Sequence, residues 1–198
     1  MAKRLLLLLI VVLALLGFAS CGAYNSLVTA EEAVEAAWAQ VENVYQRRND
    51  LVPNLVETVK GAANFEQETL TGVIEARAKA TQITAEMTPE AINDPKTLER
   101  FQQVQGELSS ALSRLLVTVE RYPELKANQN YLALQSQLEG TENRIAVERR
   151  NFNDIARDFN TRIRRLPGSL IASIAGMQAK AYFEATEGAQ TAPTVKFD

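Results

Sequence analysis

Hydrophobic side chains recur at helical spacing along most of this chain. Leu27, Val34 and Val41 stand seven residues apart, and Trp38 and Tyr45 repeat that interval beside them. Seven residues make about two turns of an α-helix, so both sets lie on one face. Stripes of this kind, with members three, four or seven residues apart, predict four long helices. The predicted helices cover residues 26–61, 65–85, 95–122 and 131–166. Their further stripe positions are Val52, Leu55 and Val59 in the first helix, Leu70, Val73, Ile74 and Ala80 in the second, Leu98, Phe101, Leu108, Leu112, Leu115, Val119 and Tyr122 in the third, and Tyr131, Leu138, Ile145, Phe152, Phe159 and Leu166 in the fourth.

Residues that start or stop helices mark the ends of these segments. Thr29 and Glu32 have the spacing of a capping box near the start of the first helix. Asp94 followed by Pro95 is a favourable start for the third helix, and Pro123 stops it. The sequence therefore predicts an all-α fold, an antiparallel four-helix bundle with long helices behind an N-terminal anchor. Two shorter helices are predicted beyond the bundle, at residues 169–176 and 178–185.

The N-terminus has the pattern of a targeting or anchoring segment. Lys3 and Arg4 precede an uncharged run over residues 5–23, which is long enough to span a hydrocarbon core of about 30 Å as a helix. The same pattern is typical of a secretory signal, and Ala19-Ser20-Cys21-Gly22 resembles the lipobox of bacterial lipoproteins, whose cysteine is lipidated. Residues 1–23 are therefore predicted to be a signal or anchor segment, either lipidated at Cys21 or a single transmembrane helix.

The position of the basic residues predicts how the chain is oriented in the membrane. Lys3 and Arg4 precede the apolar run, and the next basic residue after it is Arg47. The positive-inside rule places the N-terminus in the cytoplasm and the rest of the chain outside it, on the periplasmic or extracellular side. That exported part is predicted to comprise a helical bundle over residues 24–185 and an extended tail over residues 186–198.

Composition and charge exclude several classes of function. The net charge of -3 argues against a nucleic-acid partner. The chain has no histidine, so it cannot form a Ser-His-Asp triad or a metal site that needs imidazole. Its one cysteine cannot form an intramolecular disulfide. We therefore expect no enzymatic activity, no catalytic residues, no metal site and no cofactor.

Residues 47–56 break several helix rules inside the first predicted helix. Pro53 lies in the helix interior and leaves the Asn49 carbonyl without its usual donor. Arg48 falls on the apolar stripe, as Arg77 does in the second helix. The stretch is either a kink that fits the bundle or a polar notch for a partner or ligand. The candidate interaction or bundle-locking residues are Arg47, Arg48, Asp50, Pro53, Asn54 and Arg77.

Two groups of this stretch need partners if they are buried. The Asn49 carbonyl is expected to accept a hydrogen bond from Asn54, Arg48, Arg47 or water. A buried arginine head needs an acidic partner. An internal ion-pair network that fixes the register of the bundle is favoured over catalysis. The candidate acids are Asp50, Glu57, Glu75 and Asp154.

Several short motifs stand in order along the chain: Arg47-Arg48-Asn49-Asp50-Leu51-Val52-Pro53-Asn54-Leu55-Val56, Arg121-Tyr122-Pro123-Glu124-Leu125-Lys126, Leu138-Glu139-Gly140-Thr141-Glu142-Asn143-Arg144-Ile145 and Pro193-Thr194-Val195-Lys196-Phe197. Together they resemble the LemA family of bacterial membrane proteins. The resemblance implies an antiparallel four-helix bundle behind a short N-terminal anchor, and no established activity, cofactor or catalytic residue. Typical members have a plain membrane segment, so Cys21 departs from the family pattern.

These features favour a membrane-anchored helical interaction or scaffold module of the bacterial envelope. The anchor is expected to hold the chain on the membrane, and the partner is expected to be another envelope protein. Two alternatives stay open. One is a ligand-binding protein that uses a polar notch near Asp50, Asn54 and Arg77. The other is a self-associating protein that organises membranes.

Overall fold

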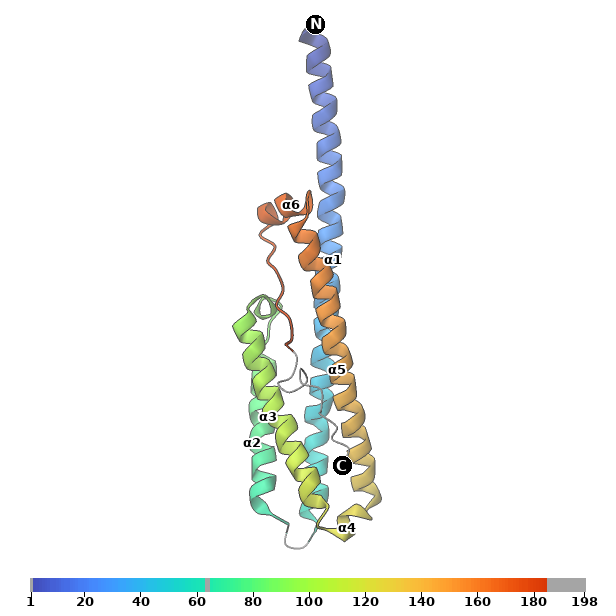
Figure 1. Cartoon of the computed structure of the whole chain (residues 1–198), viewed down its shortest axis with the longest axis vertical. Coiled ribbons are helices and arrows are strands. Elements are labelled where there is room, and N and C mark those ends of the chain that lie inside the picture. The colour runs from blue at the N-terminus through green and yellow to red at the C-terminus, as the bar shows by residue number, and fades with distance from the viewer. Residues whose placement is uncertain (1, 63–64, 185–198) are drawn as a thin grey trace, which may run out of the picture.

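The fold is described by a computed structural model over residues 2–62 and 65–184, without the side chains of residues 2, 5, 12–17 and 19. Every regular element in these ranges is a helix, which confirms the predicted all-α class (Figure 1). The predicted tail at 186–198 lies outside the described residues. The elements are α1 (Ala2–Lys60), α2 (Gln67–Glu86), the 3-10 helix η1 (Ala91–Asn93), α3 (Pro95–Val119), α4 (Pro123–Lys126), α5 (Gln129–Arg164) and α6 (Gly168–Ala175).

The first helix is much longer than the sequence predicts. α1 runs unbroken from Ala2 to Lys60, so a helix start at Ser26 or Thr29 is wrong. The Thr29 hydroxyl donates to the Asn25 carbonyl at 2.9 Å, one turn earlier in the same helix, instead of capping a new one. The helix is also continuous through Pro53. The predicted anchor and the first helix of the body are therefore one continuous helix.

The boundaries of α3 show which predicted signals hold. The Asp94 carboxylate accepts from the backbone N–H groups of Lys96 and Thr97, both at 3.2 Å, which confirms the predicted cap. α3 ends at Val119, earlier than predicted, because the backbone turns before Pro123. A proline disfavours helical geometry in the residue ahead of it, so the chain leaves the helix within that last turn.

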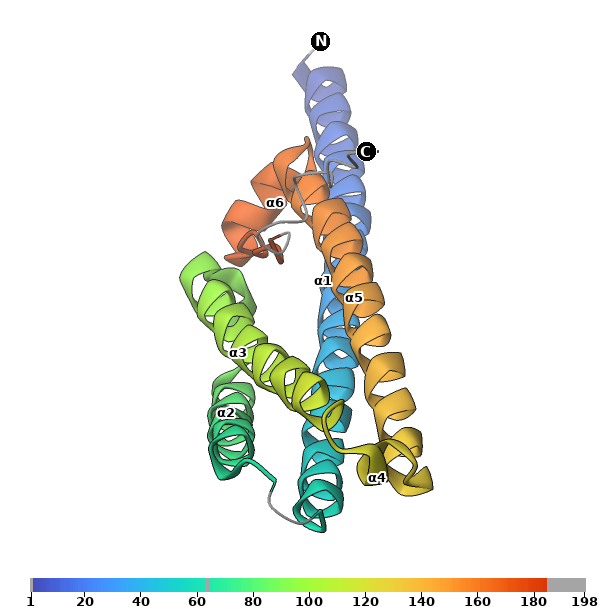
Figure 2. The same cartoon turned by 60° about the horizontal axis from the view of Figure 1, so that its bottom comes forward.

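The long helices are arranged as two close pairs. α1 packs along α5, and α2 packs along α3, with α2 also touching α1. Figure 1 shows α1 and α5 side by side and running in opposite directions, whereas Figure 2 shows α3 inclined across them. The N-terminal part of α1 extends alone beyond α6.

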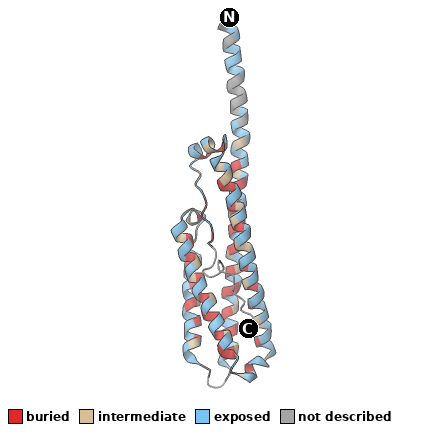
Figure 3. Ribbon diagram, in the orientation of Figure 1, coloured by how far each residue is buried: buried red, intermediate tan, exposed pale blue. Residues whose placement is uncertain are grey.

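Most of the predicted apolar stripes are the buried faces of the helices (Figure 3). Two stripe positions are wrong. Ile74 is 46% exposed, because α2 turns Val73 and Ala76 inward instead. Leu166 is 75% exposed, because it lies beyond the end of α5. The correctly predicted core positions include Leu27, Val34, Trp38, Val41, Tyr45, Val52, Leu55, Val59, Leu98, Phe101, Leu108, Leu112, Leu115, Val119, Tyr131, Leu138, Ile145, Phe152 and Phe159.

The described residues after α6, 177–184, form no helix, so the helix predicted for residues 178–185 is wrong over its described part. Two asparagines of α5 hold the backbone of residues 177–184, which we call the amide-held segment. Asn160 donates to the Lys180 carbonyl and accepts from the Lys180 N–H, both at 2.8 Å. Asn153 donates to the Phe183 carbonyl at 2.9 Å and accepts from its N–H at 2.8 Å. Each side chain therefore supplies the donor and the acceptor that a helix would otherwise provide.

A third amide and an aromatic cluster complete the anchoring of this segment. Gln102 of α3 donates to the Glu184 carbonyl and accepts from its N–H, both at 3.1 Å. The Phe183 ring stacks on Trp38 at a centroid distance of 6.0 Å and meets the edge of Phe152 at 5.6 Å. Burial of Phe183 together with six backbone hydrogen bonds outweighs the local preference for a helix.

Replacing Asn160 with aspartate tests the amide-held segment. A carboxylate still accepts from the Lys180 N–H, but it cannot donate to the Lys180 carbonyl. We expect Asn160→Asp to lower the free energy of unfolding at neutral pH by about 1–3 kcal/mol, measured by urea denaturation. Asn143→Asp, at an exposed position of the same helix, is the control, and its effect should stay within about 0.5 kcal/mol. Equal losses in both variants would contradict the role of Asn160.

Candidate functional site

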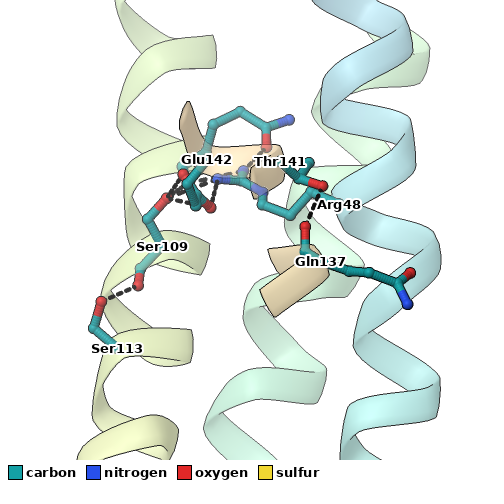
Figure 4. A network of polar contacts seen from close by, with 7 residues as sticks. Arg48, Ser109, Ser113, Gln137, Thr141 and Glu142 are labelled. Carbon is teal, nitrogen blue, oxygen red and sulfur yellow. Dashed lines mark hydrogen bonds and ion pairs between the residues drawn. The ribbon is translucent and has the colours of Figure 1, made fainter. Parts of the chain in front are cut away.

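Arg48 is buried in the body, with 1% of its surface exposed. Its guanidinium donates to the Ser109 hydroxyl at 2.7 Å and to the Glu142 carboxylate at 3.0 Å (Figure 4). It also donates to the Gln105 carbonyl at 3.1 Å and to the side-chain oxygen of Gln105. One side chain of α1 thus bonds to both α3 and α5.

Gln105 extends this network to the fourth long helix. Its side-chain oxygen accepts from Arg48, so its NH₂ group points the other way. That group donates to the Ala80 carbonyl at 3.2 Å and to the Thr84 hydroxyl at 2.9 Å. Every long helix therefore contributes to one polar layer, which consists of Arg48, Thr84, Gln105, Ser109 and Glu142.

The polar layer lies between two apolar clusters. On α1, Tyr45 belongs to one cluster and Val52 to the other, with Arg48 between them. On α5, Ile145 and Leu138 are divided in the same way around Glu142. The layer therefore crosses the core between the two apolar clusters.

The structure corrects the predicted acidic partner of Arg48. The partner is Glu142, and not Asp50, Glu57, Glu75 or Asp154. Glu142 keeps 38% of its side chain exposed, so only one member of the ion pair is fully desolvated. The heptad spacing points to Glu142 once the register of α1 against α5 is known. Because α1 and α5 run in opposite directions with Ser26 beside Arg162, counting three heptads along both helices brings Arg48 to the neighbourhood of Glu142.

The carbonyl released by Pro53 also has a different partner from those predicted. Arg77 of α2 donates through its Nε to the Asn49 carbonyl at 2.9 Å, so Asn54, Arg48 and Arg47 do not fill this role. Arg77 therefore joins α2 to α1 at the position where the proline interrupts the helical hydrogen bonds. Its place on the stripe of α2 is explained by this bond.

The other predicted residues lie at the surface of α1. Arg47, Asp50, Pro53 and Asn54 are exposed, and Asp50 accepts from Gln46 of the same helix at 2.8 Å. The structure thus brings Arg48 and Arg77 into the contacts between helices and leaves these four facing outward.

A cleft of about 830 Å³ opens between α3 and α5 beside the polar layer. Arg48 and Tyr45, at 1% and 2% exposure, form its inner wall. Basic and acidic side chains are mixed around it, so the lining shows no net preference for an anion or a cation. None of the described lining residues is Asp50, Asn54 or Arg77. The charged lining residues are Arg48, Lys96, Glu99, Glu142, Arg149 and Glu184.

Tyr45 is the titratable group of this wall whose ionisation is perturbed by its surroundings. Burial raises the pKa of the Tyr45 phenol above its usual value, and the guanidinium groups of Arg149 and Arg48 oppose the rise without cancelling it. Arg48 also lies over the Tyr45 ring, with its Cζ 5.1 Å from the centroid. Both observations show that the inner wall is poorly solvated.

Three observations bear on the predicted anchor and on metal binding. Cys21 is an exposed free thiol on α1. Over the part of the chain that the structure describes, no helix offers an apolar stretch long enough to cross a membrane. Over the same residues, no group of three or more Cys, Asp and Glu side chains is placed to hold a metal ion.

Comparison with known proteins relates the chain to one family. The LemA family model matches residues 37–197. Protein LemA of Metamycoplasma hominis is 25% identical over 182 residues, which cover 92% of this chain and 78% of that protein. Magnetosome protein MamQ of Magnetospirillum gryphiswaldense is 28% identical over 174 residues, and Magnetosome protein MamQ 1 of Paramagnetospirillum magneticum is 26% identical over 175 residues. Both matches cover 81% of this chain and 64% of the relative, so the chain spans just under two thirds of these magnetosome proteins.

Substitution of Arg48 tests whether the polar layer stabilises the fold. Arg48→Ala removes the donor for Ser109, Glu142 and Gln105 and leaves a cavity in the core. We expect the free energy of unfolding to fall by about 3–5 kcal/mol, measured by chemical denaturation. Arg47→Ala, at the exposed neighbouring position, should change it by less than about 0.5 kcal/mol. If the two variants are equally stable, Arg48 does not lock the helices.

The raised pKa of Tyr45 predicts a loss of stability in alkali. In the unfolded chain the phenol titrates near its ordinary value of about 10, whereas the folded chain holds the proton to higher pH. The stabilisation is complete below the unfolded pKa and is lost as the pH rises through the folded pKa. We expect Tyr45→Phe to show a smaller fall in unfolding free energy above about pH 10 than the wild type. Tyr24→Phe, at an exposed position, should follow the wild-type curve.

Proposed function

Since the chain belongs to the LemA family, we propose that it is a membrane-anchored helical interaction module of the bacterial envelope. The observation that carries this proposal is the free N-terminal part of α1, which extends beyond the other helices (Figure 1). Six consecutive large apolar residues there, Leu6 to Val11, are each 52–63% exposed. No other element among the described residues covers them.

The physical argument is the cost of exposing that surface to water. Transfer of apolar surface out of water is favourable by roughly 25 cal/mol per Å². A run of leucine, isoleucine and valine around a whole helix can be covered on all sides by lipid, which needs no complementary protein face. Lys3 and Arg4 at its start favour a cytoplasmic N-terminus and a body on the periplasmic or extracellular side. The anchor is either this helix in the bilayer or a lipid on Cys21.

The body is proposed to act as one unit, an antiparallel four-helix bundle joined by the polar layer. Because Arg48 donates to both Gln105 and Glu142, its terminal nitrogens are engaged inside the body instead of being offered to a substrate. This supports a role in binding rather than in catalysis. The proposed partner is another envelope protein, with the cleft between α3 and α5 as the concave surface next to the rigid layer.

Charged substitutions in the apolar run test the anchor. The double variant Leu8→Arg/Ile10→Arg places two charges in the proposed hydrocarbon core, at a cost of about 2.5–3.5 kcal/mol each. We expect the full chain to shift from the membrane fraction to the soluble fraction when expressed in bacteria. Leu132→Arg, at a leucine of α5 that is 49% exposed, is the matched control and should stay with the membrane. A membrane fraction unchanged by the double variant would count against the anchor.

Cys21→Ser distinguishes the two kinds of anchor within the same fractionation. If Cys21 is lipidated, the wild-type chain is cut before this residue and carries a lipid mass, and the serine variant keeps its N-terminal segment. If residues 5–23 form an uncleaved span, both chains have the full-length mass. Intact-mass measurement of the membrane fraction separates the two.

A further inference from the structure

We propose that α6 and the turn before it form a second membrane-contact surface, which rests on anionic lipid headgroups beside the anchor. The inference rests on the proposed anchoring of the chain but does not depend on whether the anchor is a helix or a lipid. It assigns a lipid-binding role to a part of the body that is separate from the polar layer and the cleft.

The surface of α6 is apolar on the side that faces away from the protein. Residues 166–179 contain no charged side chain. Leu166, Leu170 and Ile174 are 75%, 62% and 89% exposed, and they follow one another at intervals of four residues. At this spacing the side chains of Leu170 and Ile174 lie on one face of α6, with Leu166 leading into it. The exposed surface is therefore a continuous apolar patch.

The opposite side of α6 is fixed against the body. Gly168 and Ala172 are buried. Gly168 packs close to Leu27 of α1, since a Cβ added to the glycine would lie 3.8 Å from Leu27 Cδ2. Because the helix packs through these small residues, Leu170 and Ile174 point outward. α6 is thus held with this orientation and cannot bury the patch by turning over.

The level of α6 along α1 matches the edge of a bilayer. Arg162, at the end of α5, donates to the Ser26 hydroxyl at 3.2 Å, and Gly168 lies beside Leu27. Ser26 and Leu27 follow the last residue of the apolar run, Ala23, by only about 5–6 Å of helix rise. The headgroup layer on each side of a bilayer is about 5–8 Å thick. Figure 1 shows α6 where the free part of α1 leaves the body.

Charge identifies the lipid class that suits this surface. Arg164 and Arg165 are exposed immediately before Leu166, at the same end of α5. Exposed arginines next to an apolar patch are the pattern of interfacial helices, whose cations contact anionic headgroups while apolar side chains enter the acyl boundary. A bilayer that contains an anionic phospholipid is therefore the proposed occupant.

A tryptophan probe on α6 tests the contact. The full chain carrying Ile174→Trp is reconstituted in phosphatidylcholine vesicles with phosphatidylglycerol, with and without bromine on the upper acyl carbons. The fluorescence of the new tryptophan is the emission of the variant minus that of the wild type, which contains Trp38. We expect brominated lipid to lower this difference about two-fold, because the side chain lies at the acyl boundary. Val117→Trp, at an exposed position on α3, is the matched control and should not be quenched. Arg164→Gln/Arg165→Gln in the Ile174→Trp chain should reduce the quenching.

The outcomes separate this proposal from the anchor. If the chains float with the vesicles and Ile174→Trp is quenched no more than Val117→Trp, the α6 contact is wrong while the anchor stands. If Ile174→Trp emission is blue-shifted without quenching, a second copy or another protein covers the patch, which also overturns the proposal. If wild-type chains do not float, the anchor fails, and the α6 contact fails with it.

Discussion

Burial of the Arg48 charge is the constraint on which the arrangement of the helices depends. A guanidinium in an apolar core needs hydrogen-bond partners for its terminal nitrogens and an opposite charge close to it. Those partners come from α3 and α5, and Gln105 passes the requirement on to α2. Apolar stripes alone would pack almost as well after a shift of one heptad, whereas the polar layer fits at one register. Close packing of side chains forms the two apolar clusters, and the bonds of Arg48 fix the position of the boundary between them.

Much of the helical body could be predicted from the sequence because its signals are local. The heptads of α1 and α5 and the Asp94 cap depend on neighbours within two turns, and the structure bears them out. The Arg48 network was predicted in kind, as a lock between helices. Its acid was misassigned, because the choice among carboxylates depends on the register of helices 94 residues apart in sequence. The helical period supplies the spacing, whereas the register comes from contacts between α1 and α5.

The amide-held segment could not be predicted in this way. Its sequence, with alanines and a glutamine, is compatible with a helix, and distant side chains, among them Asn153, Asn160 and Gln102, favour the non-helical path. An asparagine on a buried stripe is ambiguous by itself, since it can satisfy its amide in several ways. The long α1 was missed for a related reason: Thr29 has the side chain of a cap but lies inside a helix that continues past it.

The continuity of α1 has a mechanical consequence. A helix without an intervening loop resists twisting, so its two ends keep a fixed angular phase. Each residue turns the helix by about 100° around its axis. The angle between the face of the N-terminal part of α1 and the direction in which the cleft opens is therefore fixed. A rotation of that part about the helix axis would rotate the whole body by the same angle. The rotation of the N-terminal part of α1 and the direction of the cleft are therefore coupled through one helix axis.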